Sequence, residues 1–312
     1  MADYDLLVLG DANPDLVLSG DQVEPAFGQA ERLVDHATLT IGGSGAILAC
    51  GAARLGLRVA FAGVVGDDLF GAFMREQLTA RGVDIGGVVV DPRRPTGVTV
   101  VLSGPEDRAI LTSLGTIGDL RAALIDPGTI ASTRHVHVSS YFLQRGLAAE
   151  LPEIFERVHR AGATTSVDPN WDPSEGWDGG LIDLLPQVDV FLPNEMEALR
   201  LAHISDIDEA VTRLRARAPF VVIKRGDRGA LGARTGELVE VPAIPTRVVD
   251  ATGAGDSFDA GFLTAFLSGE PLDVSLRIAN ACGALSTRSS GGTDGQPTMD
   301  EVLGELERGS AA

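Results

Sequence analysis

The sequence predicts an α/β protein in which a mostly parallel sheet lies in an αβα layering and a smaller sheet stands outside it. Two patterns indicate this fold class. Apolar runs at 6–10, 59–66 and 220–223 alternate with helical segments, as buried parallel strands joined by helices do. Four other short strands have few helices between them. With 312 residues and 44% hydrophobic content, the chain can bury a sizeable core, and we expect a single domain over 1–312.

Composition narrows the partners and the compartment. The formal net charge of −19 argues against binding to nucleic acid or to an anionic membrane, because both require a basic surface. Cys50 and Cys282 lie in apolar segments of small residues and are interpreted as buried free thiols. Residues 1–5 lack the basic start of a signal peptide, and no run reaches the ~18 apolar residues of a membrane span. We therefore expect a cytoplasmic protein.

The first strand, at 6–10, leads into a turn-like segment at 11–15. Ligands of open α/β sheets gather at the carboxyl ends of strands, so Asp15 is a candidate for binding substrate hydroxyls. A turn-stabilising role is the alternative for this side chain. Four short strands follow in two sets and form the predicted small sheet, at 16–18, 38–41, 97–102 and 109–111.

Gly42 and Gly43 open a helix of small residues that runs to about residue 55. A glycine pair lets a ligand approach backbone N–H groups closely, and tight packing of the helix entry is the alternative. After the strand at 59–66, Asp67 and Asp68 stand where the next helix begins. We expect them to cap that helix rather than to bind a metal.

The middle of the chain continues the alternation of strand and helix. Asn194 and Glu197 follow a strand and stand three residues apart, so they face the same way in a helical first turn. Glu197 is a candidate for holding Mg²⁺ through water, since Mg²⁺ keeps several waters and takes few carboxylates. An ordinary helix cap is the alternative. The predicted elements here are strands at 136–140, 164–167 and 188–192 and a helix at 148–160.

Other polar residues at strand ends are less specific. Asp168 and Asn170 place an acid and an amide at the edge of the predicted sheet. Lys224, at the end of the strand that begins at 220, is interpreted as a phosphate contact or as a solvated lysine. The histidines have no metal-ligand spacing and are interpreted as structural, namely His135, His137 and His159.

The stretch 250–258 carries the strongest chemical signal. Gly253, Ala254 and Gly255 have almost no side chain, so their N–H groups can approach an anion at the start of the helix that follows. Asp256, in the first turn, would repel that anion unless it accepts the proton of a hydroxyl that attacks a phosphoryl group. An Asp that only favours a helix N-terminus is the alternative.

The string Asp250-x-Thr-Gly-Ala-Gly-Asp-Ser-Phe258 resembles the C-terminal signature of the ribokinase-like, or PfkB, family of carbohydrate and nucleoside kinases. Gly42-Gly43 and Asn194-x-x-Glu197 match earlier motifs of that family, in the same order. The resemblance implies a ribokinase-like fold over the whole chain. It also implies a lid, formed by about 12–40 and 92–113, that closes over the sugar and often forms a homodimer contact.

The resemblance also implies roles for single residues. The catalytic base would be Asp256, and the anion hole would be Gly253, Ala254 and Gly255. The acceptor would lie against Asp15, Gly42, Gly43 and Ile47. ATP would be bound by Asn194, Lys224, Gly226, Gly229 and Asn280, with Glu197 on the Mg²⁺ side. A monovalent cation, K⁺, would lie near Asp250, Thr252 and the 289–291 loop. Ile47 departs from the family pattern, which has Asn there, so the acceptor or its pose differs from that of a typical ribokinase.

The predicted function is an ATP- and Mg²⁺-dependent kinase that phosphorylates a hydroxymethyl group of a sugar or sugar derivative. A nucleoside kinase of the same fold is the first alternative, because Ile47 makes one side of the pocket more apolar. A non-catalytic sugar-binding regulator is the second, although it has little reason to retain Asp256 and the anion hole together. A dinucleotide-dependent oxidoreductase is excluded, because 10–14 lacks the glycine pattern of a dinucleotide turn.

Overall fold

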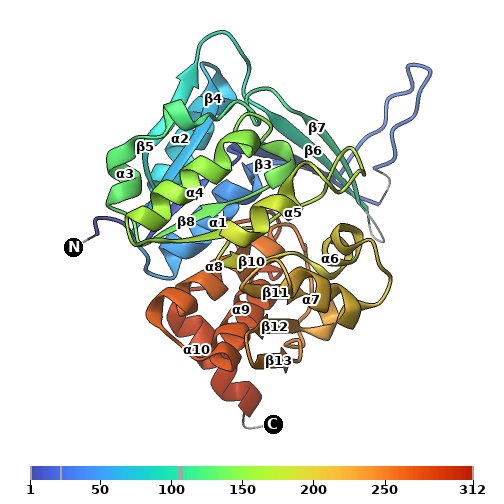
Figure 1. The fold of residues 1–312 in the computed structure, drawn as a ribbon. Coiled ribbons are helices and arrows are strands. Elements are labelled where there is room, and N and C mark those ends of the chain that lie inside the picture. The colour runs from blue at the N-terminus through green and yellow to red at the C-terminus, as the bar shows by residue number, and fades with distance from the viewer. Residues whose placement is uncertain (1, 22, 105–107, 311–312) are drawn as a thin grey trace.

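The computed structural model describes residues 2–21, 23–104 and 108–310 (Figure 1). Within this part of the chain a nine-stranded sheet runs in the order β13-β12-β11-β10-β9-β8-β1-β4-β5. Its neighbours pair in parallel except at β11–β12 and β12–β13, which are antiparallel. The strands are β1 Leu6–Leu9, β4 Val59–Gly66, β5 Asp84–Asp91, β8 His135–Val138, β9 Thr164–Val167, β10 Val190–Phe191, β11 Phe220–Lys224, β12 Ala230–Arg234 and β13 Glu237–Val241.

Helices cover both faces of this sheet, and each face has its own apolar core. Successive residues of β1 point to opposite faces, so Leu6 and Val8 enter one core and Leu7 and Leu9 the other. The first face is covered by α1 Ser44–Arg54, α2 Leu69–Ala80, α8 Ala254–Ser268, α9 Leu272–Ser286 and α10 Met299–Ser310. The second is covered by α3 Pro127–Ala131, α4 Leu151–Arg160, α5 Leu181–Leu184, α6 Glu195–Ala202 and α7 Ile207–Arg215. The predicted αβα layering is confirmed.

A separate four-stranded sheet, in the order β3-β2-β6-β7, stands beside the large one (Figure 1). Its strands are β2 Asn13–Ser19, β3 His36–Gly42, β6 Val98–Ser103 and β7 Arg108–Ser113. The predicted small sheet is therefore present, although Gln22 and 105–107 lie outside the described residues. The turn predicted at 11–15 is wrong, because β2 already begins at Asn13 and pairs with β3 and β6.

The two faces of the small sheet differ in polarity. Asp15 lies opposite Thr40 on β3 and Thr99 on β6, and Thr99 lies opposite Thr112 on β7, so one face carries a polar row. The next row, on the other face, is apolar from edge to edge and consists of Leu39, Leu16, Val100 and Leu111.

The predictions for single helix caps and strands are confirmed in part. Asp68 accepts the N–H of Gly71 at 2.8 Å and caps α2 as predicted, and it also accepts two bonds from Thr96. Asp67 does not cap α2. The strand predicted at 188–192 shrinks to Val190–Phe191, and the β12–β13 hairpin was not predicted. Short 3₁₀ segments occur at Ala122–Leu124, Tyr141–Leu143, Ala148–Glu150, Leu185–Gln187 and Gly226–Arg228.

Other expectations concern buried polar side chains. Cys50 and Cys282 are buried free thiols, as predicted. His135 and His137 are fully buried and share the hydroxyl of Ser166, at 2.6 and 2.7 Å, which agrees with a structural role. Among the residues that the structure describes, no helix is long and apolar enough to cross a membrane.

Candidate active site

The N-terminus of α8 is the centre of the site. Gly253 is its N-cap with a φ of 71°, a conformation that L side chains rarely adopt. A Cβ at this position would lie 2.9 Å from Gly292 and from Ile47, so glycine is required for packing as well. The helix then begins at Ala254, and its first N–H groups belong to the predicted anion hole, although that of Ala254 also donates to Ala251 O at 3.3 Å.

Two cavities meet at this helix terminus. Ala254 and Gly255 line a cavity of about 600 Å³ on one side. Gly253 and Asp256 line a second cavity of about 630 Å³ on the other side. We call these the α9-side cavity and the small-sheet cavity. An anion bound by the α8 amides would therefore lie between them.

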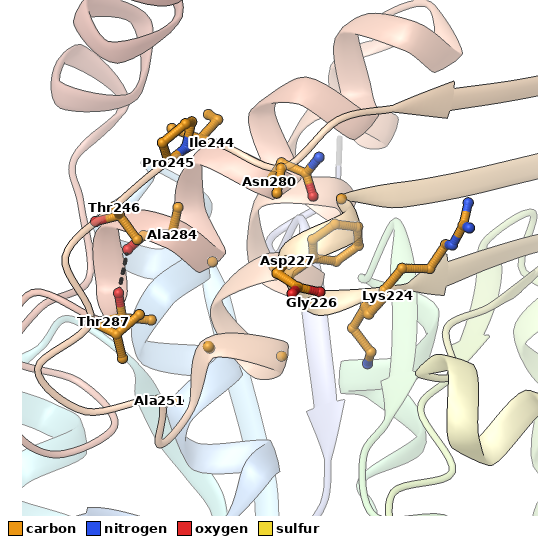
Figure 2. Close-up of a pocket in the computed structure, with 18 residues that line it drawn as sticks. Lys224, Gly226, Asp227, Ile244, Pro245, Thr246, Ala251, Asn280, Ala284 and Thr287 are labelled. Atoms are coloured by element: carbon orange, nitrogen blue, oxygen red, sulfur yellow. Dashed lines mark hydrogen bonds between the residues drawn. The ribbon is translucent and has the colours of Figure 1, made fainter. Parts of the chain in front are cut away.

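The α9-side cavity contains most residues predicted for the nucleotide. Figure 2 shows Lys224, Gly226 and Asn280 of α9 among the residues that line it, and Gly229 lines it as well. Asn280 is buried and donates to Pro242 O at 2.9 Å. The wall formed by Ile244, Pro245 and Thr246 was not predicted, because this segment has no regular structure and reaches the cavity only through the tertiary fold.

The small-sheet cavity contains the residues predicted for the acceptor. Asp15, Gly43 and Ile47 line it together with Asp256. Gly42 lies beneath Asp15, where any Cβ would collide with the Asp15 carboxylate. The lining also includes residues not assigned to the site from sequence: Asp11, Asn13, Thr99, Arg108, Asn170 and Trp171.

Carboxyl groups crowd this cavity. Burial, together with the charges of Asp11 and Asp250, raises the pKa of Asp15 to about 7, although Arg108 and Thr99 act to lower it. Asp256 is half-buried, and burial followed by the charge of Asp168 raises its pKa well above the ordinary value. Lys224 opposes that rise. Such perturbed carboxyl groups at a cavity are typical of proton-transfer sites.

Asn194 and Glu197 form a capping box at the start of α6. The side chain of Asn194 accepts the N–H of Glu197 at 2.9 Å, and Glu197 accepts the N–H of Asn194 at 2.7 Å. The helix-cap alternative is therefore present in the structure. Glu197 is buried, and burial followed by Asp168 raises its pKa to about 7. Within the described part of the chain, no three His, Cys, Asp or Glu side chains could jointly hold a metal ion.

Asp250 ties its turn to the following loop. One oxygen accepts the N–H and hydroxyl of Thr252 at 2.8 and 2.7 Å, and the other accepts the N–H of Gly291 at 2.8 Å. The guanidinium of Arg108, from β7, donates to the Thr252 hydroxyl at 2.9 Å and lies 3.8 Å from Asp250. Both Asp250 carboxylate oxygens are therefore bonded within the protein with a cation beside them, so they are not open ligands for the predicted K⁺.

Lys224 was interpreted from the sequence either as a phosphate contact or as a solvated lysine, and the structure contradicts the solvated lysine. Its Nζ lies 3.0 Å from Asp168 Oδ2 and 2.9 Å from Asp259 Oδ2, and its side chain is 11% exposed. Burial lowers the pKa of Lys224, but the two carboxylates more than offset this and raise it above the ordinary value. Asp259 follows Asp256 by one helical turn, a spacing that could have suggested a shared site.

The sequence profile of the pfkB family of carbohydrate kinases matches residues 3–299. The chain belongs to the PfkB family. It is a sugar or nucleoside kinase, a phosphotransferase with an alcohol group as acceptor.

Individual PfkB relatives agree with this. Fructokinase of Klebsiella pneumoniae is 32% identical, over 96% of this chain and 98% of that protein. Ribokinase of Arabidopsis thaliana, solved with ribose and ATP, is 26% identical with a TM-score of 0.84, over 98% and 99% of the two chains. An Escherichia coli protein provisionally called ribokinase II, solved with ATP and Mg²⁺, is 26% identical with a TM-score of 0.85, over 98% and 99%. The ribokinase-like fold is confirmed.

Proposed function

We propose that the protein transfers the γ-phosphoryl group of ATP to a hydroxymethyl group of a sugar or sugar derivative, with Asp256 as the base. The observation that carries the proposal is the meeting of two cavities at the N-terminus of α8, with Asp256 on the small-sheet side. The α9-side cavity would hold ATP and the small-sheet cavity the acceptor. The ligands of the Arabidopsis ribokinase and the Escherichia coli protein support this choice of substrates.

In the proposed reaction, the Asp256 carboxylate takes the proton of the acceptor hydroxyl as its oxygen forms a bond to the γ-phosphorus. The bond from that phosphorus to the bridging oxygen breaks, and ADP leaves. The N–H groups of Gly253, Ala254 and Gly255 stabilise charge on the transferred phosphoryl oxygens. Asp15 binds acceptor hydroxyls from the small sheet, and Asn280, Gly226 and Gly229 line the nucleotide site.

The residues present would contact Mg²⁺ through its coordinated waters rather than as direct ligands. When bound with ATP it would neutralise charge on the phosphate oxygens. Glu197 already has both oxygens bonded to Asn194, at 2.6 and 2.7 Å, so it would meet hydrated Mg²⁺ as a second layer. This agrees with the preference of Mg²⁺ for waters and phosphates over an all-protein cage.

A nucleoside is the second candidate acceptor, and one observation favours it. The small-sheet cavity has several apolar lining residues, and two of them, Ile110 and Trp171, remain 55% and 44% exposed. A flat base could cover these side chains. The apolar lining residues include Ile110, Leu114, Ile117, Leu143, Trp171 and Pro173.

The small sheet is proposed to act as the lid over the acceptor, since Asp15, Thr99 and Thr112 face the cavity from its polar row. Its apolar row on the other face is proposed as a homodimer contact. The buried thiols of Cys50 and Cys282 agree with a reducing compartment, and we propose the cytoplasm.

The test is ATP-dependent phosphorylation across pentoses, hexoses, keto-sugar acids and nucleosides with Mg²⁺, with wild type and Asp256→Asn. We expect transfer to one class, lowered by roughly 10²-fold or more in the variant, or about 3 kcal/mol of barrier. Asp273→Asn is the matched control, because Asp273 also lies in a first helical turn but pairs with Arg277 on the surface. Near-normal turnover in Asp256→Asn would show that Asp256 is not the catalytic base. Sugar binding by wild type without phosphoryl transfer would favour the non-catalytic sugar-binding regulator.

A further inference from the structure

A buried ion-pair cluster lies behind the N-terminus of α8. Lys224 Nζ stands 3.0 Å from Asp168 Oδ2 and 2.9 Å from Asp259 Oδ2. The three side chains are 11%, 7% and 0% exposed. They come from the end of β11, from the segment after β9 and from α8, so three elements converge on one ammonium group. We call these residues the Lys224 cluster.

The ammonium group lies beside the proposed anion hole. A Cβ built on Gly255 would lie 4.0 Å from Lys224 Nζ, and both residues line the α9-side cavity (Figure 2). Lysine carries its point charge on a flexible four-carbon stem. Here two ion pairs hold the ammonium group in place, so its charge is a fixed part of the site.

Nearby carboxyl groups disfavour the ionised form of Asp256, and the charge of Lys224 opposes this effect. Asp11, after β1, and Asp15, on β2, line the small-sheet cavity with Asp256, Asp168 after β9 raises its pKa, and Asp259 lies one turn further along α8. The cations around the two cavities are Lys224, Arg108, Arg145 and Arg225. Arg108 bonds to Thr252, Arg145 is exposed, and Arg225 pairs with Glu195 and Glu240.

Lys224 and Arg225 are the two shielded cations of this set, with side chains 11% and 15% exposed, and Lys224 is the one whose ammonium group lies beside Gly255 of α8. Like charges and burial both favour the protonated form of a carboxyl group, and a protonated Asp256 cannot accept the proton of an acceptor hydroxyl. A fixed ammonium group offsets both effects, because its attraction for the ionised carboxylate is little screened by solvent at a buried position.

We propose that Lys224 is a positioning residue for phosphoryl transfer, clamped by Asp168 and Asp259 so that its charge favours the ionised form of Asp256. The inference rests on the proposed role of Asp256 as base. It differs from a phosphate contact, because the charge acts on the base and not on ATP. It also gives Asp168 and Asp259 a function, namely to fix the ammonium group.

The test compares wild type with Lys224→Met and Asp168→Asn. The ionisation of Asp256 is followed by ¹³C NMR titration of protein labelled at its Asp carboxyl groups, where the Asp256 signal is the one missing from Asp256→Asn. We expect a midpoint about one pH unit or more higher in Lys224→Met, because a nearby positive charge is lost. We expect a lower midpoint in Asp168→Asn, because a nearby negative charge is lost while Asp259 still holds the ammonium group at 2.9 Å.

The pH dependence of kcat/KM should shift as well, measured with the acceptor identified in the phosphorylation test. Its acidic limb should move to higher pH in Lys224→Met and to lower pH in Asp168→Asn. A purely structural role would lower the plateau without opposite shifts of the limb. Arg134→Met is the matched control, because Arg134 pairs with the largely buried Asp5 at 3.1 Å at the amino-terminal end of β1, where it should leave the midpoint unchanged.

If Lys224→Met does not fold, the inference is tested with Asp168→Asn and Lys224→Arg instead. Because Lys224→Arg keeps the positive charge, its Asp256 midpoint should lie near that of wild type. Midpoints that stay in place in both Lys224→Met and Asp168→Asn overturn the inference. Full turnover in Asp256→Asn overturns the proposed function instead, whatever the midpoints do.

Discussion

Asp15 meets two opposed demands with one side chain. Its proposed role requires access to acceptor hydroxyls, yet it is 6% exposed and shares its surroundings with Asp11 and Asp250. Burial and these neighbours raise its pKa to about 7. The folded protein therefore holds a proton on Asp15 at pH values at which the unfolded chain has released it, so folding binds protons.

The consequence is a measurable pH dependence of stability. The contribution of Asp15 to the free energy of unfolding is fully present below pH ~4 and is lost as pH rises to about 7. Asp15→Asn should therefore be more stable than wild type at pH 8, by on the order of 1–3 kcal/mol, and close to wild type at pH 4. Urea unfolding at both pH values measures this.

Asp183→Asn is the control for that experiment, since Asp183 is exposed on α5. A loss of stability in Asp15→Asn at both pH values would show that hydrogen bonding, not charge, decides the behaviour of this residue. We also expect a raised KM for the acceptor in Asp15→Asn, because the carboxylate is replaced by a weaker acceptor of hydroxyl protons.

At the scale of an element, the start of α6 has two functions in one structure. Glu197 closes the capping box, and it is also the residue proposed to meet hydrated Mg²⁺. Glu197→Gln keeps a side-chain carbonyl for the N–H of Asn194 but removes the charge. We expect a several-fold higher Mg²⁺ concentration for half-maximal rate, with Tm changed by only a few degrees.

Glu209→Gln is the matched control, because Glu209 is the third residue of α7 behind the cap Asp206 and lies on the surface. It should leave the Mg²⁺ requirement unchanged. An unchanged requirement in Glu197→Gln, measured by titrating Mg²⁺ at fixed ATP, would assign Glu197 to helix capping alone.

The same elements show how far sequence can predict a site. The start of α8 and the Gly42-Gly43 pair were predicted because their chemistry is local: small residues, a helix start and an acid in its first turn. Arg108 was not assigned to the site, because it reaches Thr252 across 144 residues of chain. The state of Lys224 was also open, since only the fold brings Asp168 and Asp259 to it.

At the scale of the molecule, the small sheet remains the part with an uncovered apolar face. Leu39 and Leu111, at opposite edges of the apolar row, are 39% and 62% exposed. Such a row, presented by both copies about a two-fold axis, would bury itself in a dimer. We expect wild type to elute as a dimer in size-exclusion chromatography with light scattering, and Leu111→Glu to shift it toward monomer.

Leu238→Glu is the control, because Leu238 is 61% exposed on β13 of the large sheet, outside the proposed contact. It should leave the dimer intact. Monomeric wild type at all concentrations tested would contradict the proposed contact.

Ile47 links the choice of acceptor to the shape of the anion hole. It lines the small-sheet cavity, yet a Cβ at Gly253 would meet its Cγ2 at 2.9 Å and one at Gly292 its Cδ1 at 2.5 Å. Its carbonyl also accepts a bond from Gln296 at 2.9 Å. A lineage that changed this side chain to suit a new sugar would have to readjust the two glycines as well. We therefore expect positions 47, 253 and 292 to evolve together, as one inherited unit.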